Sequence, residues 1–192
     1  QAGYRDFLNS LTLTQQTSRT ENVPTSAIGT GALTVSGLNR NFLEIAVSSV
    51  NGTLAEYGCD ASGNNVFDEA NDGEWIACNF LNWDDNAAYL DWAGLSPITE
   101  IVYERICRGA STAGANASVL GEFAWGTTAI FATAYILSTP SMAFETASNA
   151  SATVGNANYF NTNNPAGPYR NGIFATAISN RITSGAAFYG VM

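Results

Sequence analysis

Short apolar segments separated by long polar stretches limit what this chain can fold into. Residues 12–41 and 60–73 are rich in Thr, Ser, Asn and Gly, and neither shows a regular apolar period. Only about a quarter to a third of the chain has the pattern of a helix or a strand, which is below the average for globular domains. The chain has 192 residues, 46% of them hydrophobic, so it can bury one core. We therefore predict a single loop-rich α+β domain over residues 1–192.

Three segments have the pattern of short helices. Apolar residues recur every three or four positions through residues 3–11. Asn and Asp residues that can cap a helix precede the apolar positions of residues 82–93. A third helix is predicted over residues 99–108, with Thr99 as its N-cap and Gly109 as its end.

The remaining regular structure is predicted to be short antiparallel strands. Residues 41–50 and 53–59 contain apolar and β-branched positions, and the Asn51-Gly52 pair between them is a strong signal for a tight turn. Further short strands are expected at residues 74–80, 129–137 and 172–178.

The charged residues exclude several classes of function. The chain contains neither Lys nor His, and its 7 Arg residues face 16 Asp and Glu residues, for a net charge of −9. A basic surface for nucleic acid or for an anionic membrane is therefore not expected. His-dependent nucleophiles, His-ligated zinc and a Lys Schiff base are excluded. Asp84 and Asp85 are adjacent carboxylates, but their place at a helix start favours stabilisation of the helix dipole over acid–base catalysis. These residues favour a non-catalytic role without deciding it, and we expect no membrane insertion.

The cysteines and the polar surface indicate an extracellular or cell-surface protein. An acidic, Lys-free surface rich in Asn, Thr and Ser is compatible with a compartment in which disulfides persist. Cys59 and Cys78 bracket the polar loop and are predicted to form a disulfide. Cys107 lies in a helical pattern and is predicted to be a buried apolar thiol.

The loop between Cys59 and Cys78 has the densest group of oxygen-bearing side chains. Four of them are candidate calcium ligands: Asp60, Ser62, Asn64 and Asp68. Calcium takes six to eight oxygen ligands from a flexible loop, and alternating oxygen side chains resemble the start of such a loop. The alternative is a solvated acidic loop that the two cysteines close.

Several motifs along the chain resemble one known family. In chain order they are Tyr4–Leu8, Asn82-Trp83, Ala87-Ala88-Tyr89, Pro97-x-Thr99-Glu100-x-x-Tyr103-Glu104-x-x-x-Arg108-Gly109, Glu122–Gly126, Gly155–Tyr159 and Tyr189–Met192. This series resembles the formylglycine-generating enzyme (sulfatase-modifying factor) family. The resemblance implies a loop-rich α+β fold that is related to C-type lectins.

The departures from this family concern its chemistry. The oxidase activity of the family needs a cysteine pair downstream of a Gly-Asn-Val-Trp-Glu-Trp element, and this sequence ends before that element. None of its three cysteines stands at a matching position. The resemblance also implies Asn158 as a calcium ligand, although no Asp follows it within residues 161–171. We expect the 192 residues to be part of a longer chain that carries the family's scaffold without the catalytic pair.

Three functions remain open at this stage. The first is a non-catalytic structural or adhesive domain of an extracellular surface, filament or virion assembly, with self-association or protein partners. The second is a lectin-like module that binds glycan or protein, with or without calcium, through aromatic residues of the second half of the chain. Those rings have an alternative role as the core of a loop-rich domain. The third is a fragment of an active oxidase whose catalytic part follows Met192.

Overall fold

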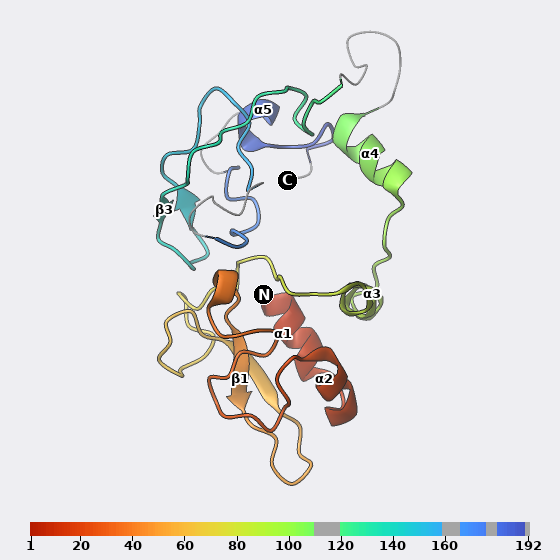
Figure 1. Ribbon diagram of the computed structural model, residues 1–192, viewed down its shortest axis with the longest axis vertical. Coiled ribbons are helices and arrows are strands. Elements are labelled where there is room, and N and C mark those ends of the chain that lie inside the picture. Colours follow the sequence, from red (N-terminus) through yellow and green to blue (C-terminus); the bar gives the residue numbers. More distant parts are fainter. Residues whose placement is uncertain (110–119, 159–165, 176–179, 191–192) are drawn as a thin grey trace. The chain divides into compact units, whose positions relative to one another are not determined.

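Helices and short antiparallel strands joined by long loops make up the fold, as predicted (Figure 1). The structure, a computed structural model, describes residues 1–109, 120–158, 166–175 and 180–190. These residues form two compact units. Unit 1 contains residues 1–96, 139–145 and 166–170, and unit 2 contains the other described residues. Each unit is described by itself.

Each unit has helices and one two-stranded antiparallel sheet. The elements of unit 1 are α1 (Ala2–Asn9), α2 (Leu13–Arg19), the 3-10 helix η1 (Leu38–Arg40), β1 (Leu43–Val47), β2 (Glu56–Cys59) and α3 (Trp83–Trp92). Those of unit 2 are α4 (Glu100–Arg108), β3 (Leu137–Ser138), β4 (Thr146–Ala147) and α5 (Arg181–Ser184).

The three predicted helices are present as α1, α3 and α4, but α2 lies in a segment predicted to be loop. Thr12 begins α2 with a capping box. Its Oγ1 accepts a hydrogen bond from the Gln15 backbone N–H at 3.4 Å, and its own N–H donates to Gln15 Oε1 at 3.0 Å. The buried residue of α2 is Gln16, which is polar, so the helix has no apolar period for a sequence pattern to reveal.

The predicted hairpin forms from β1 and β2, which pair from Leu43 opposite Cys59 to Ile45 opposite Tyr57. Asn51 and Gly52 form its turn with positive φ angles of 52° and 84°. Both angles are favourable in the tight turns that Asn-Gly pairs build.

The predicted strands at 74–80, 129–137 and 172–178 are largely wrong. In the first segment, Ile76 donates its N–H to the Gly73 carbonyl in a turn at 3.1 Å and keeps one isolated bridge, to Arg170. In the second, only Leu137 belongs to a strand. The described part of the third forms turns, with the Ala175 N–H on the Gly172 carbonyl at 3.0 Å, and 176–178 lie outside the described residues. Gly73 and Gly172 both adopt positive φ, which favours a turn over a strand at these positions.

The core of unit 1 lies between α1 and the β1–β2 hairpin. The apolar face of α1, formed by Tyr4, Phe7 and Leu8, is buried in one cluster with hairpin residues such as Ile45 and Tyr57. Partly buried residues of α3 pack against this cluster. Burial of such side chains stabilises the fold by about 1.5–3 kcal/mol each.

A buried polar side chain attaches α2 to this core. The Gln16 amide donates to the carbonyl oxygens of Leu8 at 3.2 Å and Ala55 at 2.9 Å, and its Oε1 accepts the Ala55 N–H at 3.1 Å. The side chain thus satisfies backbone groups of both α1 and the segment that leads into β2.

The 139–145 segment is attached to unit 1 through Glu145, which is fully buried. Its carboxylate forms a salt bridge with Arg40 and accepts backbone N–H groups from Ser141 at 2.8 Å and Arg170 at 3.3 Å. The Arg170 Nε also donates to the Glu145 carbonyl at 2.9 Å. One carboxylate therefore holds three segments that are distant in sequence.

We expect Glu145→Ala to reduce the free energy of unfolding by about 3–5 kcal/mol, because it leaves the buried Arg40 guanidinium without its counter-charge. Glu104→Ala is the matched control, since it removes a partly exposed partner of Arg108 on α4 and should cost less than about 1 kcal/mol. Urea denaturation of both variants measures the difference. Equal losses would show that the Glu145 ion pair does not hold unit 1 together.

Candidate functional site

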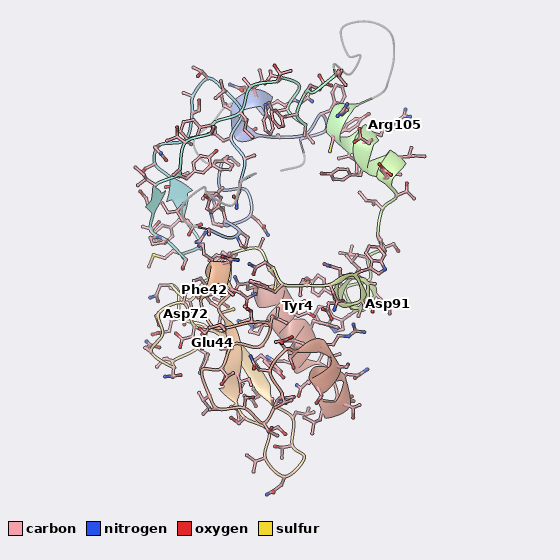
Figure 2. All side chains as sticks on the ribbon, viewed as in Figure 1. Tyr4, Phe42, Glu44, Asp72, Asp91 and Arg105 are labelled. Carbon is pink, nitrogen blue, oxygen red and sulfur yellow. The ribbon has the colours of Figure 1, made fainter. Side chains whose placement is uncertain are left out.

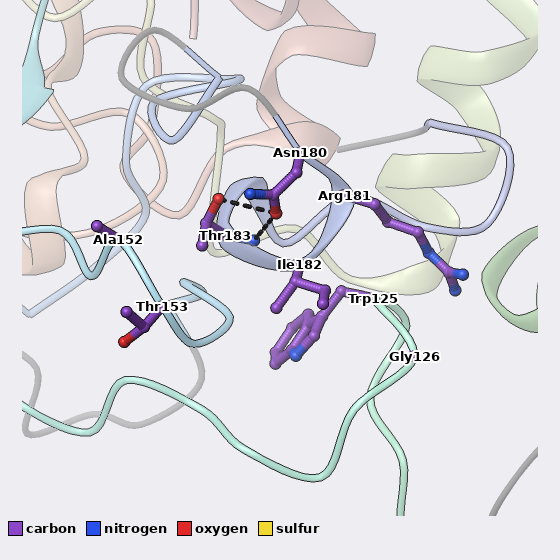
Figure 3. A pocket seen from close by; sticks show the side chains of 8 residues that line it. All are labelled: Trp125, Gly126, Ala152, Thr153, Asn180, Arg181, Ile182 and Thr183. Carbon is purple, nitrogen blue, oxygen red and sulfur yellow. Dashed lines mark hydrogen bonds between the residues drawn. The ribbon is translucent and has the colours of Figure 1, made fainter.

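A groove in unit 2 is centred on Trp125 and α5 (Figure 3). It has a volume of about 470 Å³ and is lined by Trp125, Gly126, Ala152, Thr153, Asn180, Arg181, Ile182 and Thr183. Asn180 caps α5, because its Oδ1 accepts hydrogen bonds from the Thr183 N–H and hydroxyl, each at 3.0 Å. None of these lining side chains carries a carboxylate or a thiol, and the hydroxyls of the groove are those of Thr153 and Thr183.

The polar groups of the Trp125 groove are mostly engaged in holding loops. The Trp125 indole N–H donates to the Ala129 carbonyl at 3.1 Å. Its ring lies against Gly155, where an added Cβ would come within 2.1 Å of the indole. The Arg181 guanidinium donates to the Ala124 carbonyl at 2.5 Å and lies over the Phe188 ring, with Cζ 5.2 Å from the ring centre. These contacts give Trp125 and Arg181 a structural role.

Several of the aromatic residues of the second half belong to the core, whereas Phe144 and Tyr189 are exposed. Trp125, Tyr135 and Phe174 of unit 2 are buried, and Tyr135 packs on Phe174 with ring centres 4.9 Å apart. These three buried rings therefore fit the role of core residues, which was the alternative to a binding face.

A second groove lies in unit 1 between α1, α2 and α3. It has a volume of about 310 Å³ and is lined by Phe7, Leu11, Gln15, Ser18, Arg19, Ala88, Asp91 and Trp92. The Trp92 ring contacts Phe7 and Tyr89, with ring centres 5.7 Å and 5.9 Å apart, yet the side chain remains 46% exposed. Asp91, labelled in Figure 2, and Arg19 supply charges. The groove combines an exposed ring with hydrogen-bonding groups.

Sequence reasoning missed this groove because it placed the binding face in the second half of the chain. The groove needs α2, and α2 has no apolar period. The usable signal was the Thr12-x-x-Gln15 capping pattern, which places the groove residues Gln15, Ser18 and Arg19 on a helix.

The predicted calcium loop is held by its own backbone. Asp60 is buried, and its Oδ1 accepts N–H groups from Gly63 at 2.7 Å and Asn64 at 3.2 Å. The same oxygen accepts the Ser62 hydroxyl at 3.0 Å, and Oδ2 accepts the Asn65 N–H at 2.8 Å. These donors present positive hydrogens to both oxygens of the carboxylate.

The other carboxylates of the loop are engaged in the same way. Asp72, buried near the loop's end (Figure 2), accepts the N–H groups of Ser62 at 3.2 Å and Glu69 at 2.8 Å. Asp68 accepts the Cys59 N–H at 2.9 Å and pairs with Arg5 at 2.6 Å.

The oxygens of Asp60 and Asp68 are therefore already paired with donors of this chain. Asn158 belongs to unit 2, whereas the loop belongs to unit 1. Within the described ranges, no three or more His, Cys, Asp or Glu side chains gather in a way that could hold a metal ion. Calcium binding by this chain stays a prediction.

Cys59 and Cys78 are both free thiols in the structure, and the disulfide between them stays a prediction. Cys59 is buried in the core of unit 1, and Cys78 packs against that core half-buried. The hydrogen bonds of Asp60 and Asp72 order the loop between these two cysteines without a covalent link. Cys107 on α4 is half-buried and not fully buried as predicted.

Burial suppresses ionisation of both core thiols. It raises the pKa of Cys59 to about 12 and that of Cys78 to about 11, from an ordinary value near 9.0. The neutral thiol is therefore retained in the folded chain at pH values where the unfolded chain forms thiolate. These raised pKa values contribute stability that is fully present below about pH 9 and is lost as the pH rises toward 11–12.

Alkylation at pH 8 should distinguish Cys59 and Cys78 in the folded and the unfolded chain. We expect little labelling of either in the folded chain, because the thiolate is the reactive form and burial disfavours it. In denaturant without reductant, both should be labelled, as free thiols are. Peptide mass mapping measures this. If both cysteines remain unlabelled in denaturant until a reductant is added, they form a disulfide and are not free thiols.

Helix α4 presents an apolar face that nothing in the described residues covers. Its C-terminal end is attached to unit 2, since the Cys107 carbonyl accepts the Phe188 N–H at 3.0 Å. Val102 and Tyr103, on the preceding turns, are 44% and 57% exposed, and no residue of the helix is buried. A contiguous exposed apolar face indicates an interaction surface, whereas single exposed apolar residues are common on any protein.

Comparisons of this chain with protein-family models, with curated proteins and with solved structures found no match. Among the helices that the structure describes, none is both long and apolar enough to span a bilayer.

Proposed function

We propose that this chain is a non-catalytic structural or adhesive domain of an extracellular assembly, and that it associates with copies of itself. The assembly is a cell surface, a filament or a virion. The observation that carries the proposal is the exposed apolar face of α4, formed by Val102 and Tyr103 with the half-buried Ile106 beside them. Removing such a face from water favours association with a partner.

The charge of α4 supports a second copy as the partner. The helix contains Glu100, Glu104, Arg105 and Arg108, so its charges sum to zero in a chain whose net charge is −9. Two acidic chains can therefore meet at α4 with less repulsion than at surfaces that carry the excess carboxylates.

The chemistry of the grooves supports a non-catalytic role. The Trp125 groove contains no acid–base group, and the groove beside Trp92 contains a single carboxylate, Asp91. The thiols of Cys59 and Cys78 are held neutral by burial. A formylglycine-generating-enzyme-like scaffold without its cysteine pair agrees with these observations. The alternative of an active oxidase fragment has no comparable support among them.

We expect Val102→Asp combined with Tyr103→Asp to abolish self-association, because each change places a carboxylate in an apolar contact. The loss should be about tenfold or more in the dissociation constant. Sedimentation equilibrium and light scattering over a concentration series measure it, with 20.2 kDa as the monomer mass.

Leu120→Asp is the matched control, since Leu120 is also in unit 2 and is 98% exposed but lies off α4. This variant should associate as the unchanged chain does. The proposal would be refuted if the unchanged chain stayed monomeric at high concentration. It would also be refuted if the double variant and the Leu120→Asp control changed the dissociation constant equally.

A second candidate function is glycan binding in the groove between α1, α2 and α3. The exposed ring of Trp92 offers an apolar face for a sugar ring, and Asp91, Arg19 and Gln15 offer hydrogen-bonding groups beside it. Pockets of this kind combine an apolar wall with a few polar groups that orient the ligand.

We expect Trp92→Ala to weaken binding to a glycan array by about tenfold or more if this groove is the site. Trp83→Ala is the control, because Trp83 is on the same helix and is 69% exposed but does not line the groove. The array is probed in calcium and again in chelator, which also tests the predicted calcium dependence. Absence of any glycan signal, or equal loss in both variants, would exclude this function for the groove.

A further inference from the structure

The turn that joins β1 to β2 leaves an Asn-Gly pair exposed. Asn51 and Gly52 both face solvent at the tip of the hairpin. The flanking residues close the turn without them. The Thr53 N–H donates to the Val50 carbonyl at 3.0 Å, and the Thr53 hydroxyl donates to the same oxygen at 2.9 Å.

The Asn51 side-chain amide and the Gly52 backbone nitrogen can react with each other, and no hydrogen bond among the described residues restrains either group. Within the described parts of the chain, neither the Asn51 side-chain amide nor the Gly52 N–H takes part in a hydrogen bond. A Cβ placed on Gly52 would meet no atom within 4 Å, so there is open space on that side of the backbone. Without a side chain, Gly52 also places little steric resistance between its nitrogen and the Asn51 carboxamide.

We propose that Asn51 is a site of spontaneous deamidation. The Gly52 backbone nitrogen attacks Asn51 Cγ, a C–N bond forms, and the Asn51 amide nitrogen leaves as ammonia with the proton that Gly52 loses. Water then opens the resulting five-membered imide at one of its two carbonyls, which gives aspartate or isoaspartate. No oxidant or reductant is needed.

The product differs from the original turn in two ways. Either acid adds one negative charge at the hairpin tip, on a chain that already carries −9. Isoaspartate also lengthens the backbone by one methylene between Val50 and Thr53. The turn's own hydrogen bonds lie at this point, so the modification alters the tip and leaves the buried pairs of β1 and β2 in place.

The chain contains a second Asn-Gly pair, Asn171-Gly172, which serves as an internal reference. Both of its residues take part in interactions with neighbours, and the Gly172 carbonyl accepts the Ala175 N–H at 3.0 Å. These interactions restrain the Asn171-Gly172 pair, which should slow the approach of the Gly172 nitrogen to the Asn171 side chain. We therefore expect Asn51 to react about tenfold faster than Asn171 in the folded chain.

The test incubates the folded chain at mildly alkaline pH and follows each site by peptide mass mapping and by enzymatic methylation of isoaspartate. A parallel incubation in denaturant provides the reference, because there both Asn-Gly pairs are equally exposed. The proposal expects a ratio of Asn51 to Asn171 product near ten in the folded chain and near one in denaturant. Equal ratios in the two conditions, or faster reaction at Asn171, would overturn it.

Two substitutions identify the site independently. Asn51→Gln should remove most of the product from the folded chain, because glutamine would have to form a larger, less favourable ring. Asn171→Gln should leave it nearly unchanged. Both side chains are exposed, so neither substitution disturbs the core, and the strain of Gln at the positive φ of position 51 falls on the hairpin tip. Persistence of the product in Asn51→Gln would show that another residue is the site.

Discussion

Buried oxygen acceptors that are satisfied by nearby N–H groups hold unit 1 together. Glu145, Asp60 and Asp72 are all buried, and each accepts hydrogen bonds from segments that no helix or sheet holds in place. Gln16 does the same as a neutral amide between α1 and the segment before β2. Each such group would cost free energy if it were buried without partners, so the loops must keep these positions once the core forms.

This arrangement bears on the chemistry that the chain can perform. The carboxylates of the loop at 60–73 act as acceptors for backbone donors, which leaves few oxygens available to a cation or a substrate. The thiols of Cys59 and Cys78 are kept neutral by burial in or against the core. These carboxylates and thiols thus serve the structure of unit 1. Two surface features stand apart from them, the apolar face of α4 and the groove beside Trp92.

Sequence patterns located the elements whose signals are local. The helices α1, α3 and α4 have an apolar period or a clear N-cap, and the hairpin has an Asn-Gly turn, so all four were predicted. The patterns failed where a turn at Gly73 or Gly172 competes with strand formation, and where α2 buries Gln16 in place of an apolar residue.

The sequence by itself determined the loop-rich α+β class, the helix caps at Asn82 and Thr99, and the absence of His and Lys chemistry. These properties depend on residue types and on neighbours a few positions apart. Only the tertiary structure decided that Asp60 faces backbone donors, that Glu145 meets Arg40, and that Trp92 borders a groove with α2. These pairings join residues distant in the sequence, and the free energy that selects them comes from burial in a core that no local pattern describes.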